Sequence, residues 1–260
     1  MKQGVVYTCI TGGYDRLRRH TFMHPDWEYV CFSDSLSVRD GKIRGWEIRT
    51  LQFAESDPIR NQRWHKLHPH ILFPEYELSL WVDGNVDILD SGVFDDIGKA
   101  VREGRTMAAS RHPMRDCLYD ELDACVLLRK DDAGVMRRQI DLMRRDGFPT
   151  HHGLFETNIL FRRHHDADVK KAMEDWWWWV SNHSRRDQLS LTYVLWKNKM
   201  TMSPLSDISY RNGSGVRFVY RKRHAMADFV ARFRVKCLEM GESARVFVRN
   251  GISRWSEIFL

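Results

Sequence analysis

The sequence has no run approaching the roughly 18 consecutive apolar residues with which a helix crosses a membrane. It also has no signal-peptide core, because the N-terminus passes from Met1 to Gly4 and directly into a short strand-like segment. We therefore expect a cytoplasmic protein.

Cysteine is scarce, with five residues in a chain of 260 and no C-x-x-C pair. An odd number of scattered cysteines favours neither a disulfide framework nor a zinc site. We expect free, buried thiols at Cys9, Cys31, Cys117, Cys125 and Cys237.

Several common catalytic motifs are missing as well. The sequence contains no G-x-S-x-G, no G-x-x-x-x-G-K-[ST], no G-x-G-x-x-G after its first strand and no H-E-x-x-H among its 12 histidines. These absences disfavour serine hydrolases, P-loop NTPases, dinucleotide oxidoreductases and zinc hydrolases.

What the sequence does contain is an ordinary globular composition with a basic excess. Apolar residues make up 43% of the chain and charged residues 29%, and the formal net charge is +6. Much of the excess falls between residues 211 and 250. Such a balance is compatible with a nucleic acid, an anionic membrane surface or a phosphate-bearing small molecule, and the charge alone does not choose among them.

Strand and helix patterns alternate through residue 200 or so. Short runs rich in β-branched and aromatic residues predict strands at 5–10, 28–32, 46–49, 78–82, 106–110 and 158–161. Helices are predicted at 58–70, 93–103, 166–182 and 185–197, with a long helical stretch over 116–145. This alternation predicts an α/β fold, a sheet with helices on both faces.

A cluster of oxygen-bearing side chains follows the predicted strand at 78–82. Asp83, Asn85 and Asp87 stand at alternate positions there, where ligand clefts form in open α/β sheets. Hard ions such as Mg²⁺ and Mn²⁺ prefer such oxygen ligands and keep phosphate or water in their other positions. The alternative is a plain β-turn, because Asp, Gly and Asn dominate turns regardless of function.

The helix upstream of that strand begins with Asp57 as N-cap and Pro58 at its first position. Arg60, Arg63 and Lys66 follow at three-residue steps, within an arc of roughly 120° on one helix face. Guanidinium groups bind phosphate oxygens bidentately, so this face is a candidate phosphate site. The alternative is a solvated helix face.

Two later segments carry further candidates. Glu156 can orient an acceptor hydroxyl or act as a base, or it can simply end a strand. Ser184 and Asp187 have the spacing of a capping box, which is a sufficient structural reason for both residues. Of the four consecutive tryptophans, Trp176 to Trp179, we expect two in the core and the others at the rim of an acceptor site.

Taken in order, these motifs resemble a glycosyltransferase-like family that was formerly described as a domain of unknown function. The family is known from plant cell-wall and pollen proteins and has many bacterial members. The resemblance covers residues 4 to about 224. It is carried by residues 7–15 (YTCITGGYD), 31–34 (CFSD), 63–66 (RWHK), 69–70 (PH), 79–85 (SLWVDGN), 111–115 (RHPMR), 147–149 (GFP), 153–156 (GLFE) and 184–188 (SRRDQ).

The resemblance implies a GT-A-like, Rossmann-like mixed sheet flanked by helices, in one domain over residues 1–224. It also implies a nucleotide-sugar donor, UDP-linked, with Mn²⁺ or Mg²⁺ as cofactor. The metal ligands would be Asp83, Asn85 and His224, where Asn85 replaces the second carboxylate of the family-type Asp-x-Asp. An amide carries no charge and should bind the metal more weakly.

The resemblance further assigns residues to the donor and to the chemistry. The catalytic candidates are Asp187 and Glu156. The residues that would bind the donor are Thr8, Gly12, Tyr14, Asp34, Arg60, Arg63, Lys66, Asp83 and Gln188.

The C-terminal segment, residues 225–260, has the pattern of a basic amphipathic helix. Its apolar stripe includes Met226, Phe229 and Phe233, opposite Arg232 and Arg234. Such a helix could lie on the inner face of an anionic membrane, where lipid-linked acceptors are built, or pack on its own domain.

The acceptor is expected to be a glycan or a lipid-linked sugar. Two other functions compete with glycosyl transfer: a non-catalytic carbohydrate-binding module, and a nucleic-acid binder. Only the basic net charge favours a nucleic-acid binder, because the sequence lacks RRM, KH and helix-turn-helix signatures. We therefore expect no nucleic-acid partner.

Overall fold

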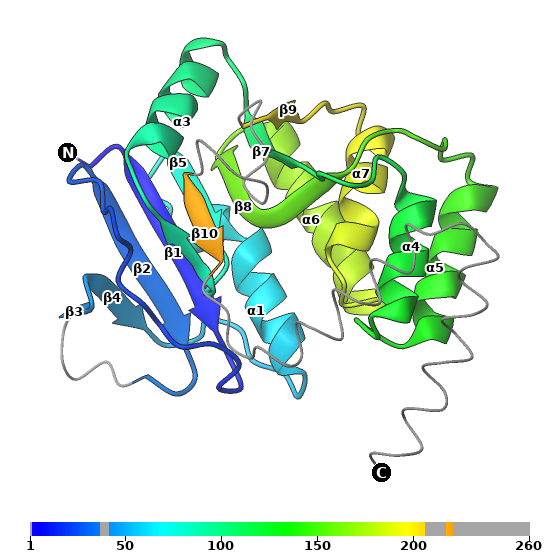
Figure 1. The fold of residues 1–260 in the computed structure, drawn as a ribbon, viewed down its shortest axis with the longest axis horizontal. Helices are drawn as coiled ribbons and strands as arrows, with labels where there is room; N and C mark the ends of the chain where they lie inside the picture. Colours follow the sequence, from blue (N-terminus) through cyan, green and yellow to red (C-terminus); the bar gives the residue numbers. More distant parts are fainter. Residues whose placement is uncertain (1, 37–41, 206–216, 221–260) are drawn as a thin grey trace.

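The computed structural model describes residues 2–36, 42–205 and 217–220. An eight-stranded mixed sheet forms its centre, with helices on both sides (Figure 1). The order of the strands in the sheet is β3-β4-β2-β1-β5-β8-β7-β9. The predicted α/β class, a mixed sheet flanked by helices, is confirmed. The predicted tail at 225–260 and the candidate ligand His224 lie outside the described residues.

One half of the sheet is parallel and Rossmann-like. β1 pairs in parallel with both β2 and β5, and β2 pairs in parallel with β4. β3 forms an antiparallel edge on β4. The strands of this half are β1 (Gly4–Ile10), β2 (Trp27–Ser33), β3 (Lys42–Ile43), β4 (Trp46–Arg49) and β5 (Leu78–Val82).

The other half is largely antiparallel. β8 runs antiparallel to both β5 and β7, and a short parallel pairing adds β9. A separate two-stranded sheet joins β6 to β10, with Tyr220 opposite Val86. These strands are β6 (Val86–Ile88), β7 (Met107–Arg111), β8 (Phe155–Arg163), β9 (Ser203–Pro204) and β10 (Phe218–Tyr220).

Alternate residues of each central strand enter opposite sides of the sheet. In β1, Val5 and Tyr7 belong to one apolar cluster, while Val6 and Ile10 belong to another. Every residue of β1 is buried, because helices cover both faces of a central parallel strand. The seven described helices are α1 (Pro58–Leu67), α2 (Pro69–Leu72), α3 (Gly92–Arg102), α4 (Leu118–Leu127), α5 (Ala133–Arg145), α6 (Ala167–Asn182) and α7 (Gln188–Lys197).

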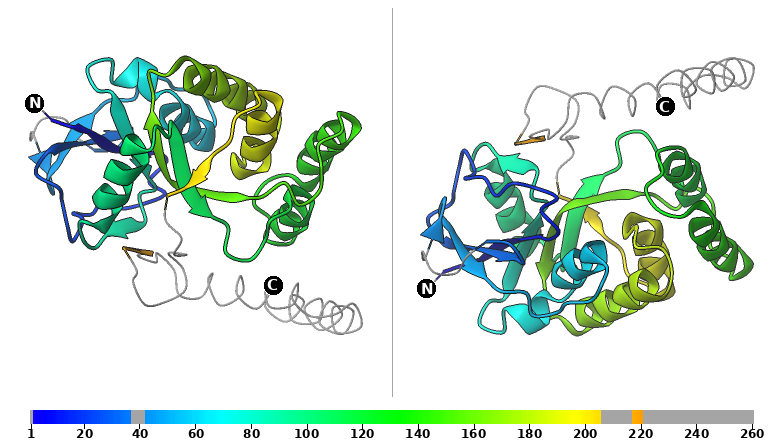
Figure 2. Two further views of the ribbon diagram at one scale, coloured as in Figure 1. Left: turned by 90° about the horizontal axis from the view of Figure 1, so that it is seen from above. Right: turned by 90° about the horizontal axis from the view of Figure 1, so that it is seen from below.

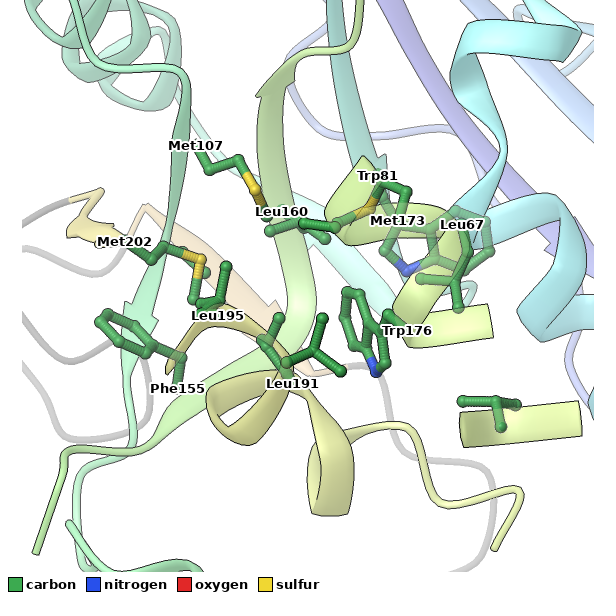
Figure 3. Packing of buried hydrophobic residues seen from close by; sticks show 14 of the residues in the cluster. Leu67, Trp81, Met107, Phe155, Leu160, Met173, Trp176, Leu191, Leu195 and Met202 are labelled. Carbon is green, nitrogen blue, oxygen red and sulfur yellow. The ribbon is translucent and has the colours of Figure 1, made fainter. Parts of the chain in front are cut away.

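The larger cluster packs α1, α6 and α7 against the sheet. Trp81 of β5 and Leu160 of β8 meet Met173 and Trp176 of α6 and Leu191 of α7 in this layer (Figure 3). α4 and α5 form a helical pair at the opposite end of the molecule from β2 and β4 (Figure 2). No helix in the described part of the chain is long and apolar enough to cross a membrane.

The predicted start of α1 is confirmed, but its predicted end at His70 is wrong. The Asp57 side chain accepts a hydrogen bond from the N–H of Ile59, and Pro58 takes the first helical position. The helix ends at Leu67, because Pro69 disfavours a helical conformation at His68, and a short second helix follows.

Two further predictions about helices need correction. The stretch 116–145 is two helices, separated by a turn in which Arg129 has a φ of 51° and Asp132 caps α5. The capping box at Ser184 does not form. Its hydroxyl donates to Asp131 instead, at 2.6 Å, and α7 begins only at Gln188.

The prediction for the thiols is confirmed where the structure describes them. Cys9, Cys31, Cys117 and Cys125 are buried and free, and Cys237 lies outside the described residues.

Among the four consecutive tryptophans, Trp176 is fully buried and Trp178 is 52% exposed. Trp177 and Trp179 are partly buried against the core.

Candidate functional site

A cavity of about 480 Å³ lies where β1 and β5 end. β8 runs the other way, so its first residues reach the same edge of the sheet, and the N–H of Asp83 donates to the carbonyl of Asn158 at 2.8 Å. The carboxyl edge of the parallel strands is where the sequence predicted a ligand site.

The turn after β5 forms an acidic wall of this cavity. Asp83 and Asn85 both line it, and so does Asp15, which packs against Gly84. The side chain of Asp83 is 31% exposed, and one carboxylate oxygen accepts a hydrogen bond from the indole N–H of Trp81 at 2.7 Å. The structure therefore brings a second carboxylate, Asp15, which the sequence analysis did not select, to this wall.

Asp87, the third member of the predicted oxygen cluster, has a different role. Its carboxylate is buried and accepts hydrogen bonds from the N–H and the hydroxyl of Thr21, at 2.7 and 2.9 Å. It also lies 3.7 Å from His20. Asp87 thus anchors the segment between β1 and β2.

The loop after β1 supplies the next part of the wall. Gly12 and Gly13 both have positive φ, of 59° and 62°, which a side chain would disfavour. The N–H of Gly12 donates to the carboxylate of Asp34 at 2.8 Å, so Asp34 holds the loop in place. Tyr14 lines the cavity with a ring that is 73% exposed.

The three predicted cations of α1 separate into different environments. Arg63 lines the cavity, and Lys66 is buried below it. Arg60 points to the end of α6, where its guanidinium donates to the carbonyls of Val180 and His183 at 3.2 and 3.1 Å. The prediction that Arg60 shares a phosphate-binding face with Arg63 and Lys66 is therefore wrong.

Asp187 is fully buried between the cations of α1. Its carboxylate lies 2.5 Å from the ammonium of Lys66 and 3.1 Å from the guanidinium of Arg63. Burial acts to raise the pKa of Asp187, but the charges of Arg63, Lys66 and Arg186 hold it well below its usual range. Burial also lowers the pKa of Lys66, against the opposing charges of Asp187 and Asp83.

Lys66 connects the two carboxylates of interest. Its ammonium is 4.0 Å from a carboxylate oxygen of Asp83, in addition to its contact with Asp187. The ion pairs therefore link the turn after β5 to the start of α7. Thr8, which was also predicted to bind the nucleotide-sugar donor, is 1% exposed within β1 and lines a small separate cavity.

Glu156 and Gln188 line the cavity from the C-terminal half of the chain. Glu156 is 2% exposed, in the second position of β8. The side-chain oxygen of Gln188 accepts from Arg186 at 2.7 Å. Its amide nitrogen is buried and has no hydrogen-bond partner within the residues that the structure describes, so it can donate to a bound molecule.

The sequence analysis missed a cationic wall. Lys130, Arg185 and Arg186 line the cavity beside Gln188. Arg185 is held by Asp57 and Asp131, at 3.1 and 3.3 Å. The sequence signal for this wall is the pair Arg185 and Arg186 before α7. The sequence analysis interpreted that segment only as a capping box.

The oxygen donors of the acidic wall suit a hard divalent ion with few protein ligands. Asp83 and Asn85 would leave positions for phosphate and water, which Mg²⁺ and Mn²⁺ commonly keep. Over residues 2–36, 42–205 and 217–220, no group of three His, Cys, Asp or Glu side chains is arranged to hold a metal. The donor set fits an ion shared with a phosphate ligand.

Comparisons with known proteins agree on one family. The sequence model of the TOD1/MUCI70, glycosyltransferase-like domain matches residues 2–212. A probable hexosyltransferase, MUCI70 of Arabidopsis thaliana, is 26% identical over 225 residues, which cover 76% of this chain. The match spans only 37% of the length of that relative.

Solved structures show more distant likeness. The glycosyltransferase GlyE of Streptococcus pneumoniae is 10% identical with a TM-score of 0.46, over 97% of this chain and 64% of that one. Mouse xyloside xylosyltransferase 1 is 9% identical with a TM-score of 0.47, over 84% of this chain and 96% of that one.

Proposed function

The chain belongs to the TOD1/MUCI70 glycosyltransferase-like family, and on that premise we propose that it transfers a hexosyl group from a UDP-linked sugar to a glycan or lipid-linked acceptor. The observation that carries the proposal is the cavity at the carboxyl edge of the sheet, which both an acidic wall and a cationic wall line. Such a cavity suits a diphosphate held between a divalent ion and arginines.

The donor would occupy the cavity along these two walls. Arg63 and Arg186 would hold phosphate oxygens, because planar guanidinium groups match them bidentately. The exposed ring of Tyr14 offers a face on which the nucleobase can stack. The glycine pair after β1 lets the ligand approach the backbone closely.

Asp83 and Asn85 would hold Mn²⁺ or Mg²⁺, which neutralises charge on the departing diphosphate when bound. The sequence resemblance implies His224 as a third ligand, and this residue lies outside the described part of the chain. Tyr220 pairs with Val86, next to Asn85, and the four residues from there to His224 can span at most about 14 Å. We therefore retain His224 as the proposed third ligand.

Transfer would break the anomeric bond to the diphosphate, form a bond to the acceptor oxygen and pass the hydroxyl proton of the acceptor to a phosphate oxygen of the departing UDP. Glu156, which lines the cavity, would orient that hydroxyl. The side-chain amide nitrogen of Gln188, which has no hydrogen-bond partner among the described residues, would donate to a sugar hydroxyl. Asp187, buried and paired with Arg63 and Lys66, would act as a positioning residue that keeps Arg63 aimed at the cavity.

The test is transfer by an Asp83→Ala variant, with UDP release from a panel of UDP-hexoses as the readout. We expect a loss on the order of 100-fold or more, because the variant lacks the carboxylate that would hold the divalent ion against the departing diphosphate. Asp141→Ala is the matched control, since Asp141 is a half-exposed carboxylate on α5. Undiminished turnover in Asp83→Ala would exclude the assignment.

The alternative of a non-catalytic carbohydrate-binding module predicts a different response to UDP. Such a module needs aromatic surfaces but no cavity with opposed charges. If UDP with Mn²⁺ leaves the melting temperature unchanged, the binding module is the better function. A cytoplasmic location and contact of residues 225–260 with a membrane remain predictions from the sequence.

A further inference from the structure

A second, smaller hollow lies between α6 and α7, outside the charged cavity. It has a volume of about 200 Å³. Its walls include Asp175, Trp178, Trp179, Tyr193, Lys197 and Asn198. We propose that it is a carbohydrate subsite, which binds one ring of a neutral oligosaccharide.

Aromatic rings form one side of the hollow. Trp178 and Trp179 lie edge to face with centroids 5.3 Å apart, and Trp179 stacks on His183 at 4.6 Å. Tyr193 of α7 meets Trp179 edge to face at 5.1 Å. These contacts fix the rings before any ligand arrives, so little conformational entropy is lost on binding.

Core packing explains the buried Trp176 but not Trp178. Trp176 is fully buried, and its indole N–H donates to the carbonyl of Asp187. Trp178 is 52% exposed, on the same helix and two residues later. Large apolar surface left in water beside a hollow is typical of a binding site, and the C–H face of a sugar ring packs well on indole.

Polar groups at the rim provide partners for sugar hydroxyls. One oxygen of Asp175 accepts from both Lys171 and Asn198, at 2.7 and 2.8 Å. Lys197 lies 2.8 Å from a carboxylate oxygen of Asp146. Because each charge at the rim already has an opposite charge beside it, the hollow favours a neutral glycan over a charged one.

The hollow lies beyond the reaction site along α7. Gln188 lines the charged cavity at the first turn of that helix, and Tyr193 and Lys197 line the hollow further along. At 1.5 Å per residue, these two residues are about 8 to 14 Å from Gln188 along the helix axis. If the proposed transfer holds, the subsite would retain a polymeric acceptor near the cavity.

The experiment measures binding of cellohexaose, xylohexaose and maltohexaose to the full chain by saturation-transfer NMR and calorimetry. We expect at least one to bind, and Trp178→Ala to weaken that binding on the order of 10-fold. Trp178→Tyr keeps an aromatic face and should restore most of it. Ile71→Ala, which removes another exposed apolar side chain, should leave it unchanged.

Two results would overturn the proposal: no binding of any of the three, or equal binding by Trp178→Ala. Binding of oligogalacturonate alone would overturn the neutral class. Asp83→Ala separates this proposal from the proposed function, because it should lose transfer but still bind the oligosaccharide. Near-ultraviolet circular dichroism checks that each variant is folded.

Discussion

The two walls of the charged cavity come from different halves of the chain and are built in different ways. The acidic wall consists of the ends of adjacent strands, with Asp83 directly after β5 and Asp15 in the loop after β1. The cationic wall joins Lys130, between α4 and α5, to Arg185 and Arg186, before α7. The first wall follows from strand order, whereas the second exists only when distant helices pack together.

Ion pairs connect the two walls, and the pair between Lys66 and Asp187 is fully buried. Lys66 contacts Asp187 and approaches Asp83, and Asp57, the N-cap of α1, also contacts Arg185. Buried pairs gain little net stability over apolar packing, but breaking one leaves an uncompensated charge. The connection between the walls should therefore be more sensitive to substitution than either wall alone.

The largest expected effect follows from removing that connection. Asp187→Ala leaves Lys66 and Arg63 without their buried carboxylate, and we expect a loss of about 3–5 kcal/mol of unfolding free energy. Urea denaturation measures it. Asp141→Ala, which removes an exposed carboxylate that pairs with Arg144, should change stability by less than about 1 kcal/mol. Equal losses in both variants would contradict the connection.

A pH effect of similar size should come from His65, which joins α1 to the segment after β4. One ring nitrogen contacts the carbonyl of Asn61 at 2.7 Å, and the other accepts from the N–H of Gln52 at 2.9 Å. Burial lowers the pKa of His65 to about 4. Since the unfolded chain keeps a pKa near 6.5, it binds more protons than the folded chain between these values.

Stability should therefore fall as the pH drops from 6.5 to 4, by up to about 1.4 kcal/mol per pH unit for His65. Burial lowers the pKa of His20 to about 4 as well, and both histidines serve the half of the chain that forms the acidic wall. Urea unfolding of a His65→Gln variant at several pH values in this range should show that its unfolding free energy falls less steeply with decreasing pH than that of the wild type. If the unfolding free energy of the variant depends on pH as steeply as that of the wild type, His65 is not a source of this pH effect.

A smaller effect should distinguish Arg186, which lines the cavity, from Arg60, which binds the end of α6. Arg186→Gln removes a cation from the cavity, and we expect the KM for the donor to rise about 10-fold, since a hydrogen bond to a charged group contributes about 1.5–3 kcal/mol. Arg60→Gln should leave KM unchanged and reduce stability by about 1 kcal/mol, because it removes bonds to the end of α6. A higher KM in Arg60→Gln would instead support the prediction from the sequence that Arg60 shares one phosphate-binding face with Arg63 and Lys66.

The smallest effect concerns the exposed rim of the cavity. Tyr14→Ala should weaken UDP binding by about 1 kcal/mol, the lower limit for stacking of a base on an aromatic ring. The side chain is 73% exposed, so stability should change by no more than about 0.5 kcal/mol. Tyr14→Phe is the matched control for the ring. Calorimetry with UDP that finds equal affinities for all three proteins would exclude stacking at this position.

Much of the fold could be predicted because its signals act over a few residues. The strand at 78–82 and the helix start at Pro58 depend on local apolar runs and on an Asp-Pro cap, and the structure has both. The errors fall where two local signals compete. Ser184 has the spacing of a capping residue, but its hydroxyl bonds to Asp131, 53 positions away.

The candidate site was predictable only in part, for the same reason. The sequence by itself determined the strand at 78–82 and the turn of Asp83 and Asn85 that follows it, because both signals are local. Tertiary structure alone decided that Lys66 meets Asp187, 121 positions later, and that Arg60 turns to α6. A long cationic side chain takes whichever carboxylate or carbonyl the packing places beside it, and helix periodicity does not contain that information.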